Sequence, residues 1–100
     1  MEFVREVPSI VVTEAPSKKS PLVVECELSR KPKDEPKWLQ NGKLLPSVKY
    51  LPKGLSVESD KSSTVHRLVF TEITSEQLGE YTLQVENIAS TGSVEMKSTF

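Results

Sequence analysis

The sequence has few of the residues that mark secreted proteins. Cysteine occurs once, as Cys26, so no disulfide can form within the chain. Neither asparagine, in "NGK" at Asn41 or "NIA" at Asn87, begins an N-x-S/T glycosylation site. Both absences favour a reducing, intracellular compartment, where disulfides are rare.

Charge of one sign and long apolar runs are also missing. The chain carries 13 Lys and Arg against 14 Asp and Glu, a net charge of -1, so no long-range field attracts nucleic acid or an anionic membrane. Its apolar runs, such as "IVV" and "LVV", are far shorter than the roughly twenty residues that span a bilayer. No signal-peptide pattern opens the sequence. We therefore expect neither nucleic acid nor a membrane as a partner.

What the sequence does contain is alternation of apolar and polar residues with a period of two. "PLVVECELS" and "EYTLQVEN" alternate in the manner of half-buried strands, and "HRLVFTEI" does so more loosely. Turn signals such as "RKPKDEP", "NGK" and "SDKSS" separate these runs. With 36% hydrophobic and 27% charged residues, the pattern predicts one all-β sandwich domain over residues 1–100.

The pattern divides into nine predicted strands. We place them at 3–7, 9–13, 21–29, 36–41, 43–46, 55–59, 64–71, 79–87 and 91–100. Only "TSEQLG" is predicted as a helical turn, with Thr74 or Ser75 as its N-cap and Gly79 as its stop.

Candidate catalytic residues are scarce. His66 is the only histidine and has no Cys or Asp at a metal-ligand spacing, so we expect it at the surface or an edge. Cys26 lies on the inward face of its strand, where a thiol is inert. Asp34 and Glu35 fall in a loop and not in the apolar pocket that a general acid needs. Four glycines form no phosphate-binding loop. We predict no enzyme, no cofactor and no metal.

Cys26 is followed by Trp38 at the head of "WLQNGK", and by Gly79 and Tyr81 in "GEYTLQV". Taken together, these spaced motifs resemble the intermediate set of the immunoglobulin fold, over essentially the whole chain. In that family a cysteine lies on strand B, a core tryptophan on strand C and Leu-x-Ile on strand E, and Asp-x-Gly-x-Tyr-x-Cys leads into strand F. A tryptophan fills the space between two sheets, and the tyrosine hydroxyl bonds to the backbone upstream. The resemblance implies a structural core of Cys26, Trp38, Leu68, Phe70, Tyr81 and Leu83.

The departures from the family pattern bear on function. Gln77 replaces the motif's aspartate, and Leu83 replaces its second cysteine, so Cys26 is expected to pack as a small hydrophobic residue. A domain without that disulfide forgoes roughly 2 to 5 kcal/mol of stabilisation. Asn87 and Gly92 enclose four residues where the family commonly has two, which predicts a longer connection between the last two strands.

With the missing disulfide, the resemblance points to the intracellular immunoglobulin modules of giant muscle and cytoskeletal proteins: the titin, obscurin, twitchin, myomesin and myosin-binding-protein group. It implies a non-catalytic, cytoplasmic spacer or docking site in a tandem array. The implied partners are sarcomeric or cytoskeletal proteins and neighbouring immunoglobulin domains, with the isolated domain monomeric. The alternative is an extracellular adhesion or receptor domain that has lost one cysteine.

One segment is more apolar than a free surface needs. "LLPSVKYLP" contains Leu45, Val48, Tyr50 and Leu51 near the expected edge strand 43–46. These residues are either an edge for a partner, docked by strand addition, or a cover that folds back over the sandwich. The sequence leaves both interpretations open.

Overall fold

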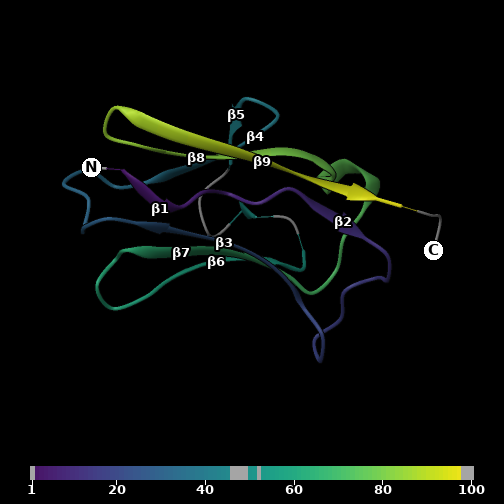
Figure 1. The fold of residues 1–100 in the computed structure, drawn as a ribbon. Helices are drawn as coiled ribbons and strands as arrows, with labels where there is room; N and C mark the ends of the chain where they lie inside the picture. The colour runs from purple at the N-terminus through teal and green to yellow at the C-terminus, as the bar shows by residue number, and fades with distance from the viewer. Residues whose placement is uncertain (1, 46–49, 52, 98–100) are drawn as a thin grey trace.

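Two β-sheets stack face to face, as predicted (Figure 1). The structure is a computed structural model that describes residues 2–45, 50–51 and 53–97. One sheet has the order β1-β3-β7-β6 and the other β2-β9-β8-β4-β5. The four strands of the first sheet are β1 (Phe3–Arg5), β3 (Leu22–Leu28), β6 (Leu55–Ser59) and β7 (Val65–Phe70). The five of the second are β2 (Ile10–Val12), β4 (Lys37–Gln40), β5 (Lys43–Leu44), β8 (Gly79–Val85) and β9 (Ile88–Met96).

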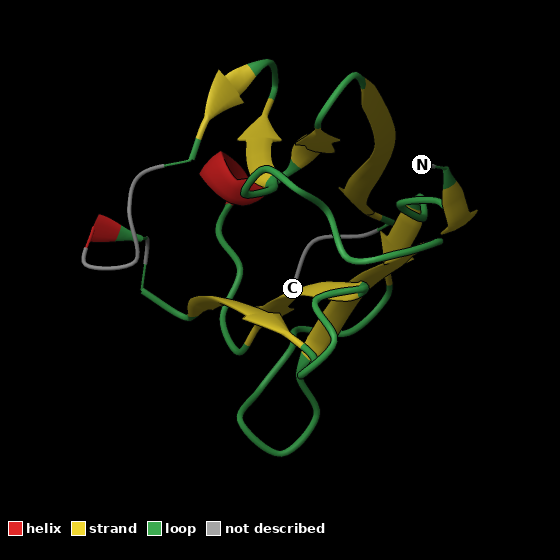
Figure 2. Ribbon diagram, turned by 90° about the vertical axis from the view of Figure 1, so that its left-hand side faces the viewer, coloured by secondary structure: helices red, strands yellow, loops and turns green. Residues whose placement is uncertain are grey.

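The core lies between the two sheets, which Figure 2 shows from one end of the sandwich. The alternation seen in the sequence sends every second side chain of β3, β7 and β8 into this layer. Its fully buried members are Val24, Cys26, Leu28, Leu68, Phe70, Tyr81, Leu83, Val85 and Val94.

The chain changes sheets within its first strands. β1 pairs antiparallel with β3, whereas β2 pairs parallel with β9, through Ile10↔Val94 and Val12↔Met96. Figure 1 shows that β1 begins at one end of the sandwich and that β9 ends at the other. The molecule is elongated along this direction, with extents of 40 × 26 × 25 Å.

Two hairpin turns show where the expectations held and where one was wrong. Asn41 and Gly42 have φ of 51° and 81°, as the predicted Asn-Gly turn between β4 and β5 requires. The longer connection predicted between the last two strands is wrong. Val85 pairs with Ile88, so only two residues form the turn, and the first of them, Glu86, has a φ of 52°. β9 consequently begins three residues before the predicted position 91.

The predicted helical turn is present as the 3₁₀ helix η2 (Ser75–Gln77), with Thr74 as its N-cap. The helix ends before Gly79, because Leu78 is already extended. The Thr74 N–H donates to Gln77 Oε1 at 2.8 Å, so the residue that replaces the family's aspartate still holds this corner together.

Candidate functional site

The six residues of the expected structural core all lie in the buried cluster between the sheets. Trp38 is 6% exposed, and the other five are fully buried. Cys26 is a free cysteine on β3, and Leu83 lies on β8 of the opposite sheet. Burial raises the pKa of the Cys26 thiol to about 12, so the thiolate that nucleophilic or redox chemistry needs does not form near neutral pH.

Tyr81 forms the corner between η2 and β8. Its hydroxyl donates to the Gln77 carbonyl, and its ring meets Phe70 edge-on with centroids 5.6 Å apart. Burial raises the pKa of Tyr81 to about 12. The hydroxyl therefore remains a donor throughout the physiological range and ties β8 to the connection before it.

The structure corrects the expectation for His66, which is 6% exposed and not a surface residue. His66 is two residues before Leu68 and four before Phe70, so the period of two already placed it on the inward face. Its ring Nε2 lies 2.8 Å from the Ser63 carbonyl oxygen. Within the described residues, no group of three or more His, Cys, Asp or Glu side chains could hold a metal ion.

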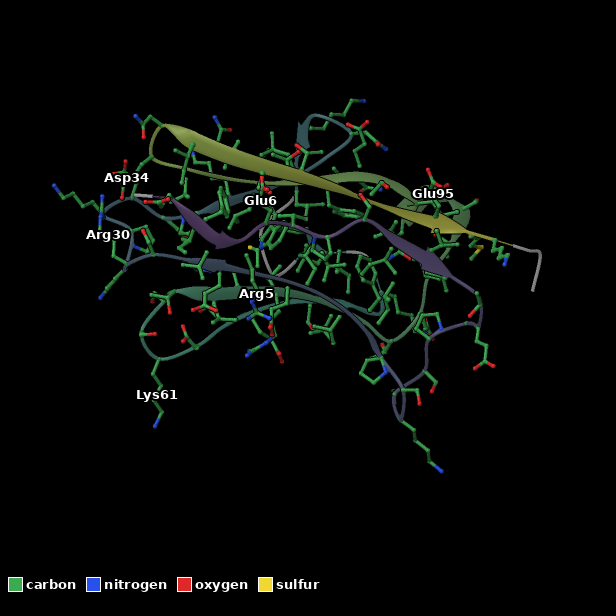
Figure 3. The ribbon with its side chains drawn as sticks, in the orientation of Figure 1. Arg5, Glu6, Arg30, Asp34, Lys61 and Glu95 are labelled. Carbon is green, nitrogen blue, oxygen red and sulfur yellow. The ribbon has the colours of Figure 1, made fainter. Side chains whose placement is uncertain are left out.

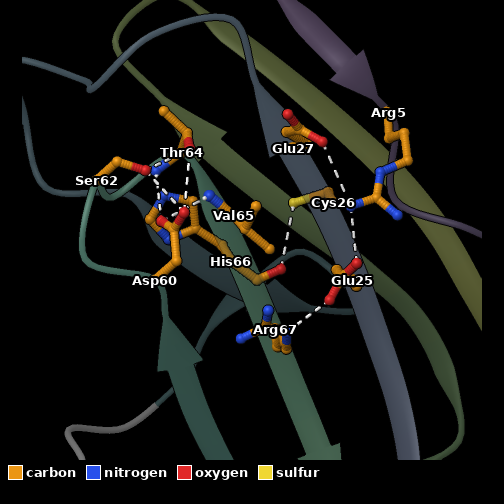
Figure 4. Close-up of polar contacts among 10 residues, drawn as sticks. All are labelled: Arg5, Glu25, Cys26, Glu27, Asp60, Ser62, Thr64, Val65, His66 and Arg67. Atoms are coloured by element: carbon orange, nitrogen blue, oxygen red, sulfur yellow. Dashed lines mark hydrogen bonds and ion pairs between the residues drawn. The ribbon is translucent and has the colours of Figure 1, made fainter.

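The turn that precedes His66 is organised by one carboxylate (Figure 4). Asp60 accepts hydrogen bonds from the Ser62 hydroxyl at 2.7 Å and from the Thr64 and Val65 amides at 2.9 and 3.1 Å. These donors, the Ser62 hydroxyl foremost, lower the pKa of Asp60 to about 2. The turn between β6 and β7, which "SDKSS" predicted, is thereby closed by the Asp60 carboxylate.

A second polar cluster covers the outer face of the four-stranded sheet (Figure 4). Glu25 accepts from Arg67 on β7 and from Arg5 on β1, the latter at 2.8 Å, and Arg5 also lies 3.4 Å from Glu27. The Arg67 hydrogen bond is the main cause that lowers the pKa of Glu25. These ion pairs link β1, β3 and β7 on the outer face of the sheet.

The loop after β3 is fastened to the tip of the β8–β9 hairpin. Glu86 accepts from both terminal nitrogens of Arg30, at 3.2 and 3.0 Å, and from the Lys33 amide at 2.8 Å. The Lys33 amide bond is the main cause that lowers the pKa of Glu86. Arg30, Asp34 and Lys61 all lie at the end of the sandwich where β1 begins, and Glu95 lies toward the other end (Figure 3). That first end is therefore charged, with residues of both signs.

The parallel pairing of β2 with β9 has support outside the strands. The Lys97 amide donates to the Val12 carbonyl at 3.1 Å, and the Val7 amide donates to the buried Ser90 hydroxyl at 2.9 Å. Gly92 passes so close to the β1–β2 connection that an added Cβ would overlap the Pro8 carbonyl. The sequence analysis did not select Ser90, and it placed Gly92 at the end of a connection and not inside β9, since neither contact has a local signal.

The expected partner edge is only partly exposed. Leu45 and Leu51 are half-buried and pack against the core, as the alternative interpretation of a cover requires, whereas Tyr50 is 75% exposed. Leu44, which sequence reasoning did not select, is 62% exposed. Val48 lies outside the described residues. Tyr50 and Leu44 are thus the exposed apolar residues that the structure describes near this edge.

This arrangement of two sheets, with β2 parallel to β9 and a tyrosine corner before β8, defines an immunoglobulin-like sandwich. The family model of the immunoglobulin I-set domain matches residues 1–100. The chain therefore belongs to the I-set family, whose domains are typically non-catalytic. No helix among the described residues is long and apolar enough to cross a membrane.

Solved structures of titin domains have the same fold. Titin domain I10 superposes with a TM-score of 0.74 at 19% identity, covering 95% of this chain and 96% of that one. The titin domains Z1Z2 in complex with telethonin give 0.76 at 20% identity, covering 98% and 48%. Titin M4 gives 0.74 at 16% identity, covering 96% and 94%. No curated protein matches the sequence. At these identities the likeness concerns the fold alone.

Proposed function

We propose that this domain is a non-catalytic structural and protein-binding module of a large cytoplasmic protein of the sarcomere or cytoskeleton, acting as a spacer or docking site in a tandem array. The observation that carries this proposal is the parallel pair β2–β9. β1 begins at one end of the sandwich and β9 ends at the other. A force applied along the chain therefore loads the β2–β9 hydrogen bonds in shear, where several must break together.

Two further observations support the proposal. Cys26 is a free thiol in the same buried cluster as Leu83, so the core is stabilised by packing without a disulfide, as suits a reducing compartment. The solved structures that resemble this chain include titin domains, and one of those was solved with telethonin, a protein partner. The elongated shape of the domain is consistent with serial linkage to neighbouring immunoglobulin domains. It is also consistent with the binding of a protein partner.

Single-molecule pulling tests the spacer role. The domain is placed between marker domains of known unfolding force, and the polyprotein is stretched from its ends. We expect a distinct peak at a force typical of strands loaded in shear. Unfolding at a force close to zero, with the domain folded before stretching, would contradict the spacer role.

The docking role needs a separate experiment. The immobilised domain is incubated with striated-muscle extract, and its bound proteins are compared with those of a variant charged at Leu44 and Tyr50, the exposed residues of the expected edge. We expect sarcomeric or cytoskeletal proteins that the folded variant does not retain. Equal recovery by the two proteins would remove this edge as a docking site.

A further inference from the structure

The outer strand β6 is the least protected edge among the strands that the structure describes. β1 and β2 have three residues each and β5 has two, and the register of β1 is irregular. β6 has five residues, "LSVES", in continuous register with β7. Edge strands are commonly protected by shortness, by charged side chains, above all lysine, by proline or by a bulge. Of these β6 has a single charge, Glu58. β6 has no lysine, proline or bulge.

The hydrogen bonds at both ends of the β6–β7 ladder show which backbone groups face outward. The Asp60 amide donates to the Val65 carbonyl at 3.1 Å, and the Thr71 amide donates to the Gly54 carbonyl at 2.7 Å. Because bonded and non-bonded pairs alternate in an antiparallel ladder, the odd-numbered residues of β6 direct their N–H and C=O away from β7. Leu55 is buried, so the exposed residues with outward backbone groups are Val57 and Ser59.

A groove of about 340 Å³ opens beside these two residues, between β6 and the loop 31–36. Trp38 and His66 line it together with Val57, and the loop contributes two prolines and four charged residues of both signs, Lys31, Lys33, Asp34 and Glu35. Val57 lies opposite Leu68 in the register, yet its side chain is 39% exposed. A strand added to this edge would direct alternate side chains into the groove, where apolar ones would cover Val57 and Trp38.

The outer side of the same edge favours a positive charge. Glu58 lies opposite Arg67 in the register, but Arg67 pairs with Glu25. Within the described residues Glu58 takes part in no ion pair. A basic side chain on an added strand would stand beside Glu58, and opposite charges on neighbouring strands stabilise a sheet.

We propose that the β6 edge at Val57–Ser59 binds an extended segment of a partner protein in which apolar residues alternate with Lys or Arg. The apolar residues enter the groove, and the basic residues lie beside Glu58. This inference rests on the protein-binding part of the proposed function and assigns it a site apart from Leu44 and Tyr50.

The probe is a capped synthetic peptide of alternating valine and lysine, compared with one of alternating valine and glutamate. Both are titrated into the isotope-labelled domain and followed by NMR. We expect the lysine peptide to shift the resonances of β6 and the Trp38 indole and to slow amide exchange at Val57 and Ser59. No binding at millimolar peptide, or shifts centred on another edge, would overturn the proposal.

Variants locate the contact. Val57→Lys introduces a charge at the proposed edge, and Val4→Lys introduces the same charge at an exposed valine of β1, the opposite edge of the same sheet. We expect Val57→Lys to weaken binding of the lysine peptide about tenfold and Val4→Lys to leave it unchanged. Glu58→Lys should reverse the preference toward the glutamate peptide. An equal loss in the two lysine variants, with both spectra still those of a folded domain, would refute the site.

A second copy of the chain is the competing occupant. If β6 paired with itself, the peptide-free domain would sediment faster at higher concentration, and Val57→Lys would abolish that increase; this result would overturn the peptide proposal. The pulling experiment does not involve the β6 edge. A domain that resists force but binds no peptide would therefore keep the spacer role and lose this site alone.

Discussion

At the scale of single residues, the core substitutes packing for covalent bonding. The position of the family's second cysteine is occupied by Leu83, and Cys26 contributes a small apolar side chain whose thiol lies 3.8 Å from the His66 carbonyl oxygen. Gln77 replaces the family's aspartate without charge and keeps a hydrogen bond to the Thr74 amide. Among the described residues, no buried side-chain nitrogen or oxygen lacks a hydrogen-bond partner, so the interior keeps its polar groups satisfied.

The tyrosine corner gives the first prediction. Tyr81→Phe removes the donor to the Gln77 carbonyl and leaves that acceptor buried without its hydroxyl partner. We expect a loss of about 1 to 3 kcal/mol in the free energy of unfolding, measured by urea denaturation. Tyr50→Phe, at a side chain that is 75% exposed, is the control and should be neutral. Equal stabilities of the two variants would show that the corner hydrogen bond contributes nothing.

Asp60 gives a prediction about pH. Its pKa falls from 3.8 to about 2 in the folded protein, so the unfolded chain takes up the proton first as the solution is acidified. The stabilisation from the Asp60 charge is present above pH 3.8 and disappears as the pH falls to about 2. In denaturation curves measured across this range, Asp60→Asn should be less stable than the wild type, and the difference should shrink with acidification. A difference independent of pH would contradict this account; Asp34→Asn in the loop 31–36 is the matched control.

At the scale of elements, the contact between β9 and the β1–β2 connection limits the volume allowed at position 92. Gly92 is the point where β9 passes the backbone of Val7 and Pro8. The buried Ser90 hydroxyl accepts from the Val7 amide nearby. The chain can change from one sheet to the other here only because β9 carries a small residue at this crossing.

Gly92→Ala tests this crossing. Since the added methyl group meets backbone and not a flexible side chain, we expect a cost of about 1 to 3 kcal/mol in unfolding free energy. Gly42→Ala is the comparison: its methyl group meets nothing within 4 Å, and only the φ of 81° is unfavourable, at about 1 kcal/mol. Thermal and urea unfolding of both variants measure the difference. If the Gly92→Ala protein were as stable as wild type, the β1–β2 connection would be free to shift and make room for the methyl group.

At the scale of the whole molecule, the β2–β9 pair is the expected force-bearing element, and the structure distinguishes its two valines. The Val12 carbonyl accepts from the Lys97 amide, and in a parallel ladder the N–H of the same residue faces the same neighbour. The Val11 backbone faces away, and its side chain is 55% exposed. Proline at the two positions therefore has different consequences for the ladder.

Val12→Pro should lower the unfolding force strongly, because proline removes an N–H that bonds to β9. Val11→Pro removes an outward N–H and should lower it less. Single-molecule pulling of both variants gives the comparison, with Asp34→Ala in the loop 31–36 as a control that should leave the force unchanged. If all three variants unfolded at one force, the β2–β9 pair would not be the mechanical element.

Alternation and local backbone preference were enough to predict the class of fold, the turns at Asn41-Gly42 and Thr74–Gln77, and most strand positions. The predicted start of β9 was three residues too late. His66 was expected at the surface or an edge, although the period of two in its strand places it on the inward face. The folded structure was needed for the crossing at Gly92, the pairing of Glu86 with Arg30 and the groove beside β6. Each of these depends on which distant segments come to lie together, and local patterns carry no information about such contacts.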